Sequence, residues 1–221
     1  MNPDVWPKLA QATLETLDMV GASVLFAALL GLPLGVLVVI TRPGHVMPLP
    51  ALQRALGVLI NTARSVPFLI LMVALFPLTR LIVGTAIGTR AAVVPMTVGA
   101  TPFVARLVEQ ALLEVDAGVI TAALSMGATP WQMVRKVLLP EALPGLVLGI
   151  TIATVSLLEF SAVAGAIGGG GLGDLGYRAG YQRYRADILL GAVVLLVAMV
   201  QAVQFLGETI AQHIRARRSI A

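Results

Sequence analysis

Residues 121–140, TAALSMGATPWQMVRKVLLP, form a short and only partly apolar stretch between two long apolar runs. Thr129 suits the N-cap of a helix, Pro130 suits its first position, and Gln132 stands where a capping-box residue reaches back to the cap. The apolar residues that follow recur at helical spacing, while the two basic residues fall on another face. The stretch therefore predicts a short amphipathic helix, ended by the final proline, held outside the lipid between two membrane spans.

The composition is that of a membrane protein. Of 221 residues, 58% are hydrophobic and 12% are charged, whereas about a quarter of a soluble domain is charged. The length leaves room for one bundle of spans and for no appended soluble domain. The residues before the first apolar run are mostly acidic, whereas a signal peptide starts with basic residues. The net charge of +4 is spread over loops and tail, without the basic patch that nucleic-acid binding needs, and the chain has no cysteine for a disulfide.

Five apolar segments are long enough to cross a bilayer, which takes about 20 helical residues. We expect them at about 17–40, 56–78, 91–113, 142–167 and 188–206, inside a transmembrane domain at 13–207. Residues 1–16 then form an amphipathic lead-in, and residues 208–221 form a basic tail; the orientation argued below puts the first at the periplasmic surface and the second in the cytoplasm. The sequence thus predicts an all-α integral membrane protein with five transmembrane helices and one short cytoplasmic helix.

Glycines spaced four apart mark expected contacts between these helices. Gly31 and Gly35 share one face of the first span, and Gly145 and Gly149 share one face of the fourth. Small residues at this spacing let a second helix approach closely. Pro33, between the first two glycines, should bend its helix.

Residues 121–140 also resemble the cytoplasmic loop signature of the permease subunits of bacterial ABC importers, which reads Glu-Ala-Ala, three residues, Gly, nine residues, then Ile, any residue, Leu-Pro. The matching positions are Ala122, Ala123, Gly127, Leu139 and Pro140, with Val137 in place of Ile and Thr121 in place of Glu. The chain is most similar to methionine-import permeases. The stretches that carry this likeness are 64–68, 126–130, 135–144 and the glycines after Ala166.

The resemblance implies a type I importer permease fold, in which the short helix couples the spans to a separate ATPase. By this resemblance the coupling residues are Ala122, Ala123, Gly127, Ala128, Thr129, Pro130, Trp131, Met133, Val134, Arg135, Val137, Leu139 and Pro140. Trp131 is the expected anchor, and Met133, Val134 and Val137 are expected to supply apolar contact. The alternative is a helix that lies flat in the lipid headgroups.

The resemblance also implies an assembly. We expect a homodimer with the path along its two-fold axis, two P-loop ATPase subunits, and a periplasmic or lipid-anchored binding protein that delivers methionine. The sequence has no phosphate-binding loop and no HExxH pair. The chain is therefore expected not to be an enzyme and to hold no cofactor, with ATP and magnesium on the partner.

Ionisable groups within spans are costly, so they mark candidate functional sites. Arg64 interrupts the second span, where it anchors the helix at the interface or serves the gate. Glu159 lies deep in the fourth span, where it faces the path, pairs with Arg64, or forms an ordinary bond between helices. Phe160, Ser161 and Val163 follow it and are expected to narrow the path.

The glycine-rich stretch 166–187, AIGGGGLGDLGYRAGYQRYRAD, has the glycine spacing of a dinucleotide-binding loop. That loop needs a strand before it, a helix after it and an acid about 20 residues on, and the sequence offers none of these. The resemblance implies an ordered outer turn near the substrate route, and its three tyrosines suit the membrane interface.

Lys and Arg are slightly more numerous in segments that become cytoplasmic when the N-terminus is outside the inner membrane, so we expect that orientation. Two other functions remain open at this point. One is a permease for another amino acid or small solute, and the other is a secondary transporter or channel that needs no ATPase.

Overall fold

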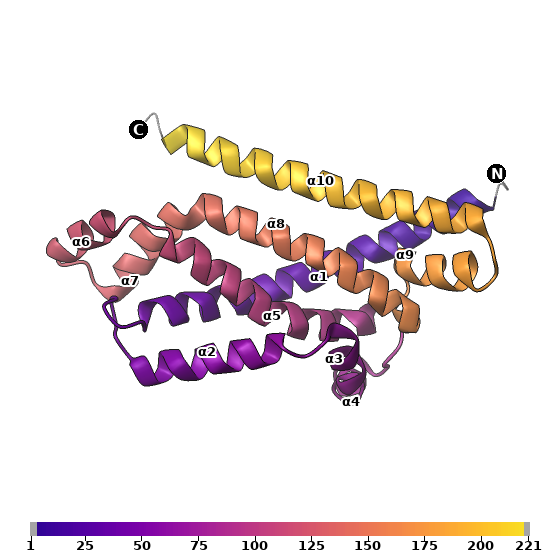
Figure 1. The fold of residues 1–221 in the computed structure, drawn as a ribbon, viewed down its shortest axis with the longest axis horizontal. Coiled ribbons are helices and arrows are strands. Elements are labelled where there is room, and N and C mark those ends of the chain that lie inside the picture. The colour runs from indigo at the N-terminus through magenta and orange to yellow at the C-terminus, as the bar shows by residue number, and fades with distance from the viewer. Residues whose placement is uncertain (1–3, 219–221) are drawn as a thin grey trace. The chain divides into compact units, whose positions relative to one another are not determined.

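The computed structural model describes residues 4–218, and every regular element in that range is helical (Figure 1). The elements are α1 (Val5–Ile40), α2 (Pro50–Arg64), α3 (Phe68–Ala74), α4 (Phe76–Val83), α5 (Thr89–Leu113), α6 (Ala117–Ser125), α7 (Pro130–Gln132), the π-helix η1 (Met133–Leu138), α8 (Leu139–Ala164), the π-helix η2 (Gly165–Gly169), α9 (Gly171–Asp174), the π-helix η3 (Leu175–Tyr181) and α10 (Ala186–Arg218).

Four helices of the described range are long and apolar enough to cross a membrane: Val5–Ile40, Thr89–Leu113, Pro130–Gly169 and Ala186–Arg217. The pair Pro50–Arg64 and Phe68–Ala74 makes a fifth when it is taken as one broken span, because the two helices meet at 97°. The second span expected at about 56–78 thus corresponds to a sharply bent pair of helices, which is either a broken span or a re-entrant loop. Pro67 disfavours helical backbone in the residue before it, and the chain turns there.

The amphipathic lead-in expected at 1–16 is not a separate element, because α1 is continuous from Val5 to Ile40. Pro7 is tolerated because it stands in the first turn, where backbone N–H groups have no partner inside the helix. Val5 and Leu9 are buried in an apolar cluster with Leu172 and Ile188. The expected surface lead-in is thus packed against α9 and α10.

The helices contribute to two compact units. The first unit joins Met1–Ala27, Val66–Ala100 and Ala153–Gln204. In it, Phe68 of α3 stacks on Phe160 of α8, with ring centroids 4.2 Å apart. Large aromatic surfaces in contact stabilise such a unit through buried area and through the stacking itself.

The glycine run before α9 lacks a capping side chain, and α1 supplies the missing acceptors. Glu15 Oε2 accepts a hydrogen bond from the Gly171 N–H, and Thr16 Oγ1 accepts one from the Leu172 N–H, each at 2.9 Å. Gly171 has a φ of +74°, and a Cβ there would lie 2.6 Å from Thr16 Oγ1. Only glycine fits this position without strain.

The second unit joins Ala28–Ser65, Thr101–Ile152 and Phe205–Ala221. A Cβ on Gly35 would lie 2.6 Å from the Ala105 carbonyl oxygen, and one on Gly149 would lie 3.2 Å from Leu107 Cβ. The predicted close packing at both glycine pairs is confirmed. Arg106 of α5 pairs with Glu109 one turn on and donates to Asn61 Oδ1 of α2 at 2.7 Å.

Candidate functional site: the coupling segment and the exposed face of α8

The coupling segment, defined here as residues 117–139, starts with α6. Asp116 is its N-cap, and Asp116 Oδ1 accepts hydrogen bonds from the N–H groups of Gly118 at 2.7 Å and Val119 at 3.3 Å. Thr121, which replaces the acidic residue of the signature, donates its hydroxyl to the Ala117 carbonyl at 2.8 Å. The Thr121 side chain is therefore engaged within its own helix.

The turn after α6 explains the glycine of the signature. The Ala128 N–H bonds to the Ala123 carbonyl at 3.1 Å, and the Gly127 N–H bonds to the Leu124 carbonyl at 2.9 Å. These two bonds form a Schellman C-cap, with Gly127 left-handed at a φ of +77°. The motif reverses the chain at a fixed angle and satisfies carbonyls at the helix end.

The helix that follows begins with the predicted capping box, which is confirmed. The Thr129 N–H bonds to Gln132 Oε1 at 2.9 Å, and the Gln132 N–H bonds to Thr129 Oγ1 at 3.3 Å, with Pro130 at the first helical position. These reciprocal bonds satisfy two donors that a helix start otherwise leaves unpaired. The direction in which the new helix leaves the turn is thereby set locally.

The expectation that this helix ends at Pro140 is wrong. The chain stays helical through η1 and into α8, so that Pro130–Gly169 is one helix of 40 residues. Within η1 the bonding changes to a spacing of five residues, and the Leu139 N–H bonds to the Val134 carbonyl. A π-helical turn of this kind lets a helix adjust around a proline instead of stopping.

The burial of Met133 and Val134 differs from what their expected role as partner contacts requires. Met133 and Leu138 are fully buried and Val134 is 8% exposed, so the expectation that Met133 and Val134 present an apolar surface to a partner is wrong for this conformation. They hold the segment to the rest of the second unit. Val137, Ala128, Leu139 and Pro140 are half-buried.

Trp131, the expected anchor, is exposed as expected, and two further exposed apolar side chains precede it in the chain. Trp131 is 69% exposed and Met126 is 88% exposed, while Leu124 is also exposed. Arg135 and Lys136 are exposed beside them. The sequence analysis missed Leu124 and Met126, although Met126 directly precedes the C-capping glycine, a position at the tip of the turn.

Trp131 also forms one wall of an apolar groove of about 610 Å³. The groove is lined by Leu32, Pro33, Val36, Leu37, Ile40, Met47, Pro130, Trp131, Val134 and Leu139. The coupling segment thus lies against the last turns of α1, within the second unit. This gives Trp131 a fixed apolar surrounding on one side and an open face on the other.

The residues expected near the path separate into two groups. Glu159 and Val163 are exposed and lie four residues apart on one face of α8. Phe160 is half-buried in its stack with Phe68, and Ser161 is buried with its hydroxyl donating to the Leu158 carbonyl at 2.7 Å. Ser161 therefore does not present its side chain to a path, which corrects that expectation.

Arg64 is exposed at the end of α2, and its guanidinium lies over the Phe103 ring, 5.8 Å from the ring centroid. Within the described residues, neither Arg64 nor Glu159 forms an ion pair. A cation over an aromatic face is stabilised by the ring quadrupole, which anchors the α2 end on α5.

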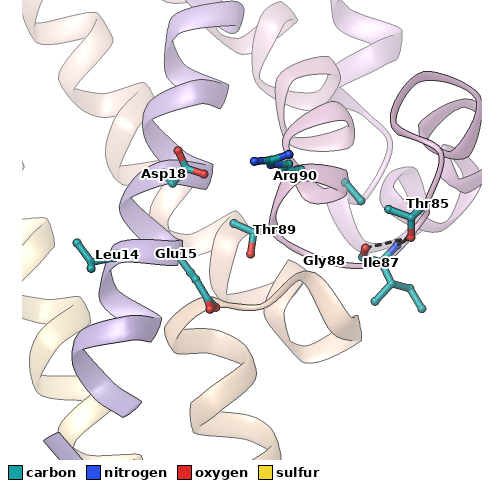
Figure 2. A pocket seen from close by; sticks show the side chains of 9 residues that line it. Leu14, Glu15, Asp18, Thr85, Ile87, Gly88, Thr89 and Arg90 are labelled. Atoms are coloured by element: carbon teal, nitrogen blue, oxygen red, sulfur yellow. Dashed lines mark hydrogen bonds between the residues drawn. The ribbon is translucent and has the colours of Figure 1, made fainter. Parts of the chain in front are cut away.

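A pocket of about 550 Å³ in the first unit was missed by the sequence analysis. Figure 2 shows that its residues come from α1 (Leu14, Glu15 and Asp18) and from the turn that enters α5. The Arg90 side chain extends toward Asp18, while the Glu15 carboxylate points away from Asp18 and binds Gly171. The pocket therefore carries charges of both signs beside the glycine-rich turn. Within residues 4–218 no group of three or more His, Asp or Glu side chains is placed to hold a metal ion.

These features define an all-helical protein with four or five segments long and apolar enough to cross a membrane, and with a turn at residues 126–129 that is capped on both sides. The model of the family described as "Binding-protein-dependent transport system inner membrane component" matches residues 31–220, and the chain belongs to this family. It is thus a multi-pass component of the inner membrane, and the predicted resemblance to importer permeases is confirmed.

Individual relatives cover nearly the whole chain. The probable D-methionine transport system permease protein MetI of Vibrio cholerae is 51% identical over 214 residues, which are 97% of this chain and 94% of that protein. The D-methionine transport system permease protein MetI of Escherichia coli K12 is 52% identical over 164 residues, 74% of this chain and 75% of that protein.

Solved structures give the same result for the fold. A chain of the MetNI methionine ABC transporter in an inward-facing conformation is 49% identical, with a TM-score of 0.95 over 97% of this chain and 99% of that chain. An amino acid ABC transporter solved with histidines is 18% identical with a TM-score of 0.71, which shows a shared fold alone. The predicted type I importer permease fold is confirmed.

Proposed function

We propose that this chain is the permease subunit of an ATP-driven importer that carries methionine across the inner membrane. The observation that supports this most is the 49% identity and TM-score of 0.95 to the methionine transporter chain over almost the full length of both. The relatives' names specify D-methionine, so transport of the D enantiomer belongs to the proposal. ATP and magnesium belong to a partner ATPase.

The proposed assembly contains two copies of this chain, two ATPase subunits and a binding protein that delivers the substrate. Large exposed apolar residues on α10, including Val194, Phe205 and Leu206, suit a helix that faces lipid or a second copy rather than water. The proposed orientation puts the N-terminus outside and the coupling segment in the cytoplasm, where an ATPase is available.

The coupling segment is proposed to sit in a groove of the ATPase. Trp131, Met126 and Leu124 supply the apolar contact, and Arg135 and Lys136 supply charge at its rim. Gly127 and the capping box hold these side chains in one geometry, so little ordering entropy is lost on binding. Because the helix continues from Pro130 into α8, a displacement of Trp131 is passed on along hydrogen-bonded backbone.

The path is proposed to run along the α8 face that carries Glu159 and Val163. Both side chains are exposed in the single chain, as expected for a face that meets a second copy or a watery path. Phe160 supports this face by its stack on Phe68, and Arg64 is proposed to fix the entry to the bend between α2 and α3.

A matched pair of glycines tests the coupling proposal. Gly127 and Gly44 have φ values of +77° and +83°, and for both no described atom lies within 4 Å of the place that a Cβ would take. Alanine at either position costs about 1–2 kcal/mol of backbone strain without an internal clash. We expect Gly127→Ala to reduce the ATPase that co-purifies with the tagged chain, and Gly44→Ala to retain it.

Trp131→Ala should act like Gly127→Ala, because it removes an exposed aromatic anchor with little effect on the fold. The measurements are the ratio of ATPase to permease after gentle solubilisation and the ATP hydrolysis stimulated by methionine-loaded binding protein. If Gly44→Ala loses as much co-purified ATPase as Gly127→Ala, the effect of Gly127→Ala comes from backbone strain and not from a lost contact with the ATPase. No ATPase with any variant, under conditions that keep the wild-type dimer, would refute the coupling proposal.

A further inference from the structure

Helix α2 is held to the rest of the second unit along one narrow face. Of its 15 residues only Ile60 is buried, in a small apolar cluster with Ala105 of α5 and Val38 of α1. Leu56, one turn earlier, packs against the same cluster and is half-buried. Segments with few buried apolar contacts open most readily from a folded protein. The position of α2 therefore depends strongly on the few other contacts that it makes.

The last turn of α2 adds two contacts with α5, and each of them involves a guanidinium. Arg106 Nη2 donates a hydrogen bond to Asn61 Oδ1 at 2.7 Å, and the Arg64 guanidinium lies 5.8 Å from the centroid of the Phe103 ring. The two residues of each helix are three apart, so they share one face of it. The pairs run in opposite order along the two helices, which are therefore antiparallel here. We call these two contacts the α2–α5 clamp.

Glu109 orients the guanidinium that makes the first contact of the clamp. It is 7% exposed and accepts from Arg106 Nη1, one turn earlier on α5. A buried carboxylate needs a counter-ion, and the rigid fork of a guanidinium can serve two acceptors at once. One nitrogen of Arg106 is thus committed to Glu109 while the other reaches Asn61. The orientation of Arg106 is therefore set within α5 and does not depend on α2.

The clamp lies at the end of α2 that leads into the bend. Arg64 is the last residue of α2, and Pro67 directly precedes α3, which meets α2 at 97°. Asn61 is exposed, and a charged contact at an exposed site adds little to the stability of a whole fold. Its main effect is local, because it fixes where the last turn of α2 lies and hence where Arg64 lies.

We propose that Arg106 is a positioning residue for transport, which holds the end of α2 on α5 through Asn61 and thereby places Arg64 before the bend. Opening the first contact of the clamp breaks one hydrogen bond, and the pair of Arg106 with Glu109 stays intact. With the clamp open, ATP hydrolysis moves the spans while α2 is not in place to close the path. This inference rests on the proposed importer function.

Hydrogen exchange of the chain assembled with its ATPase and binding protein measures the clamp directly. Asn61→Ala removes the acceptor at an exposed position and leaves the Arg106–Glu109 pair intact. The amides of α2 should then exchange about fivefold faster, the effect of one hydrogen bond from a charged donor at an exposed site. Asn61→Asp should keep the wild-type rate or slow it, because a carboxylate oxygen accepts in the same place. Thr62→Ala is the matched control, since Thr62 is the next exposed residue of α2 and lies outside the clamp.

The transport measurement is the number of ATP molecules hydrolysed for each methionine imported into proteoliposomes. Asn61→Ala should raise this ratio, and Asn61→Asp and Thr62→Ala should keep the wild-type ratio. A variant that only folds less well lowers both rates together and leaves the ratio unchanged, so a merely structural role would not give this result. Unchanged exchange in Asn61→Ala would overturn the clamp, and faster exchange with an unchanged ratio would overturn the positioning role. A wild type that hydrolyses ATP but imports no methionine would instead refute the proposed function, and the positioning role with it.

Discussion

Replacing Gly171 by alanine tests how α1 holds the glycine-rich turn. The new residue would have to adopt a φ of +74°, which costs a non-glycine residue about 1–2 kcal/mol. Its Cβ would also lie 2.6 Å from Thr16 Oγ1, so the Thr16 hydroxyl must leave the Leu172 N–H. The loss of that hydrogen bond adds about 0.5–1.5 kcal/mol.

The sum is a destabilisation of about 1.5–3.5 kcal/mol, which for a chain of this size lowers the unfolding midpoint by about 3–14 °C. Thermal unfolding in detergent measures it. Gly57→Ala is the control, because Gly57 lies inside α2 with no described atom within 4 Å of a Cβ position. That variant should be neutral or more stable, since alanine is the better helix former by about 1 kcal/mol.

A double-mutant cycle with Thr16→Ala gives the sharper result. Both single variants lose the same bond from the Leu172 N–H, so their costs should overlap and the double variant should be more stable than their sum predicts. Strictly additive costs would show that Thr16 is not the group that the new methyl meets. A Gly171→Ala variant as stable as Gly57→Ala would refute the whole account of the turn.

Two further predictions concern α8 and the loop after α1. Val163→Trp should slow methionine uptake into proteoliposomes without preventing assembly, because Val163 is exposed on the proposed path face. Glu159→Gln, on the same face, should also reduce uptake. Normal uptake by both variants would reject this path. Burial, and to a lesser extent the charge of Arg42, lowers the pKa of His45 below its usual 6.5. The folded state therefore disfavours protonated His45. The stability that neutral His45 contributes is present above pH 6.5 and is lost as the pH falls through the folded-state pKa. His45→Gln should therefore lose less unfolding temperature than the wild type between pH 7.5 and pH 5.5, and parallel losses would contradict the assignment.

Local chemistry made part of this structure predictable. The capping box at Thr129 and Gln132 depends on residues three apart, so the sequence alone contains its full cause. The close packing at Gly35 likewise follows from small residues on one helix face. The left-handed turn at Gly127 is likewise local, since its hydrogen bonds join residues of its own helix end.

The failures involve partners that are distant in sequence or competition between elements. Glu15 and Thr16 cap a helix that starts 156 residues later, and no local pattern marks them for that role. The mean hydropathy around Arg64 to Pro67 is high enough to predict one continuous span. The proline restricts the backbone of the residue before it, and the two helices meet there at 97°. Proline usually ends a helix, but the chain stays helical past Pro140 through the π-helical bonding of η1, which no local sequence pattern marks.

The survival of the helix past Pro140 changes what a coupling helix must do. A separate helix joined by a hinge could move on the ATPase without moving the spans, whereas here Trp131 and Val163 belong to the same helical run, Pro130–Gly169. Its regular part, α8, follows the π-helix η1, and the helical geometry ends in a kink at Ile167 and at Gly168, which has a φ of +97°. The π-helix η1 lies between Trp131 and α8, so the proposed displacement passes to the span through that turn. Strengthening the η1 turn should therefore tighten the link between ATP hydrolysis and transport, and loosening it should let the ATPase run without uptake.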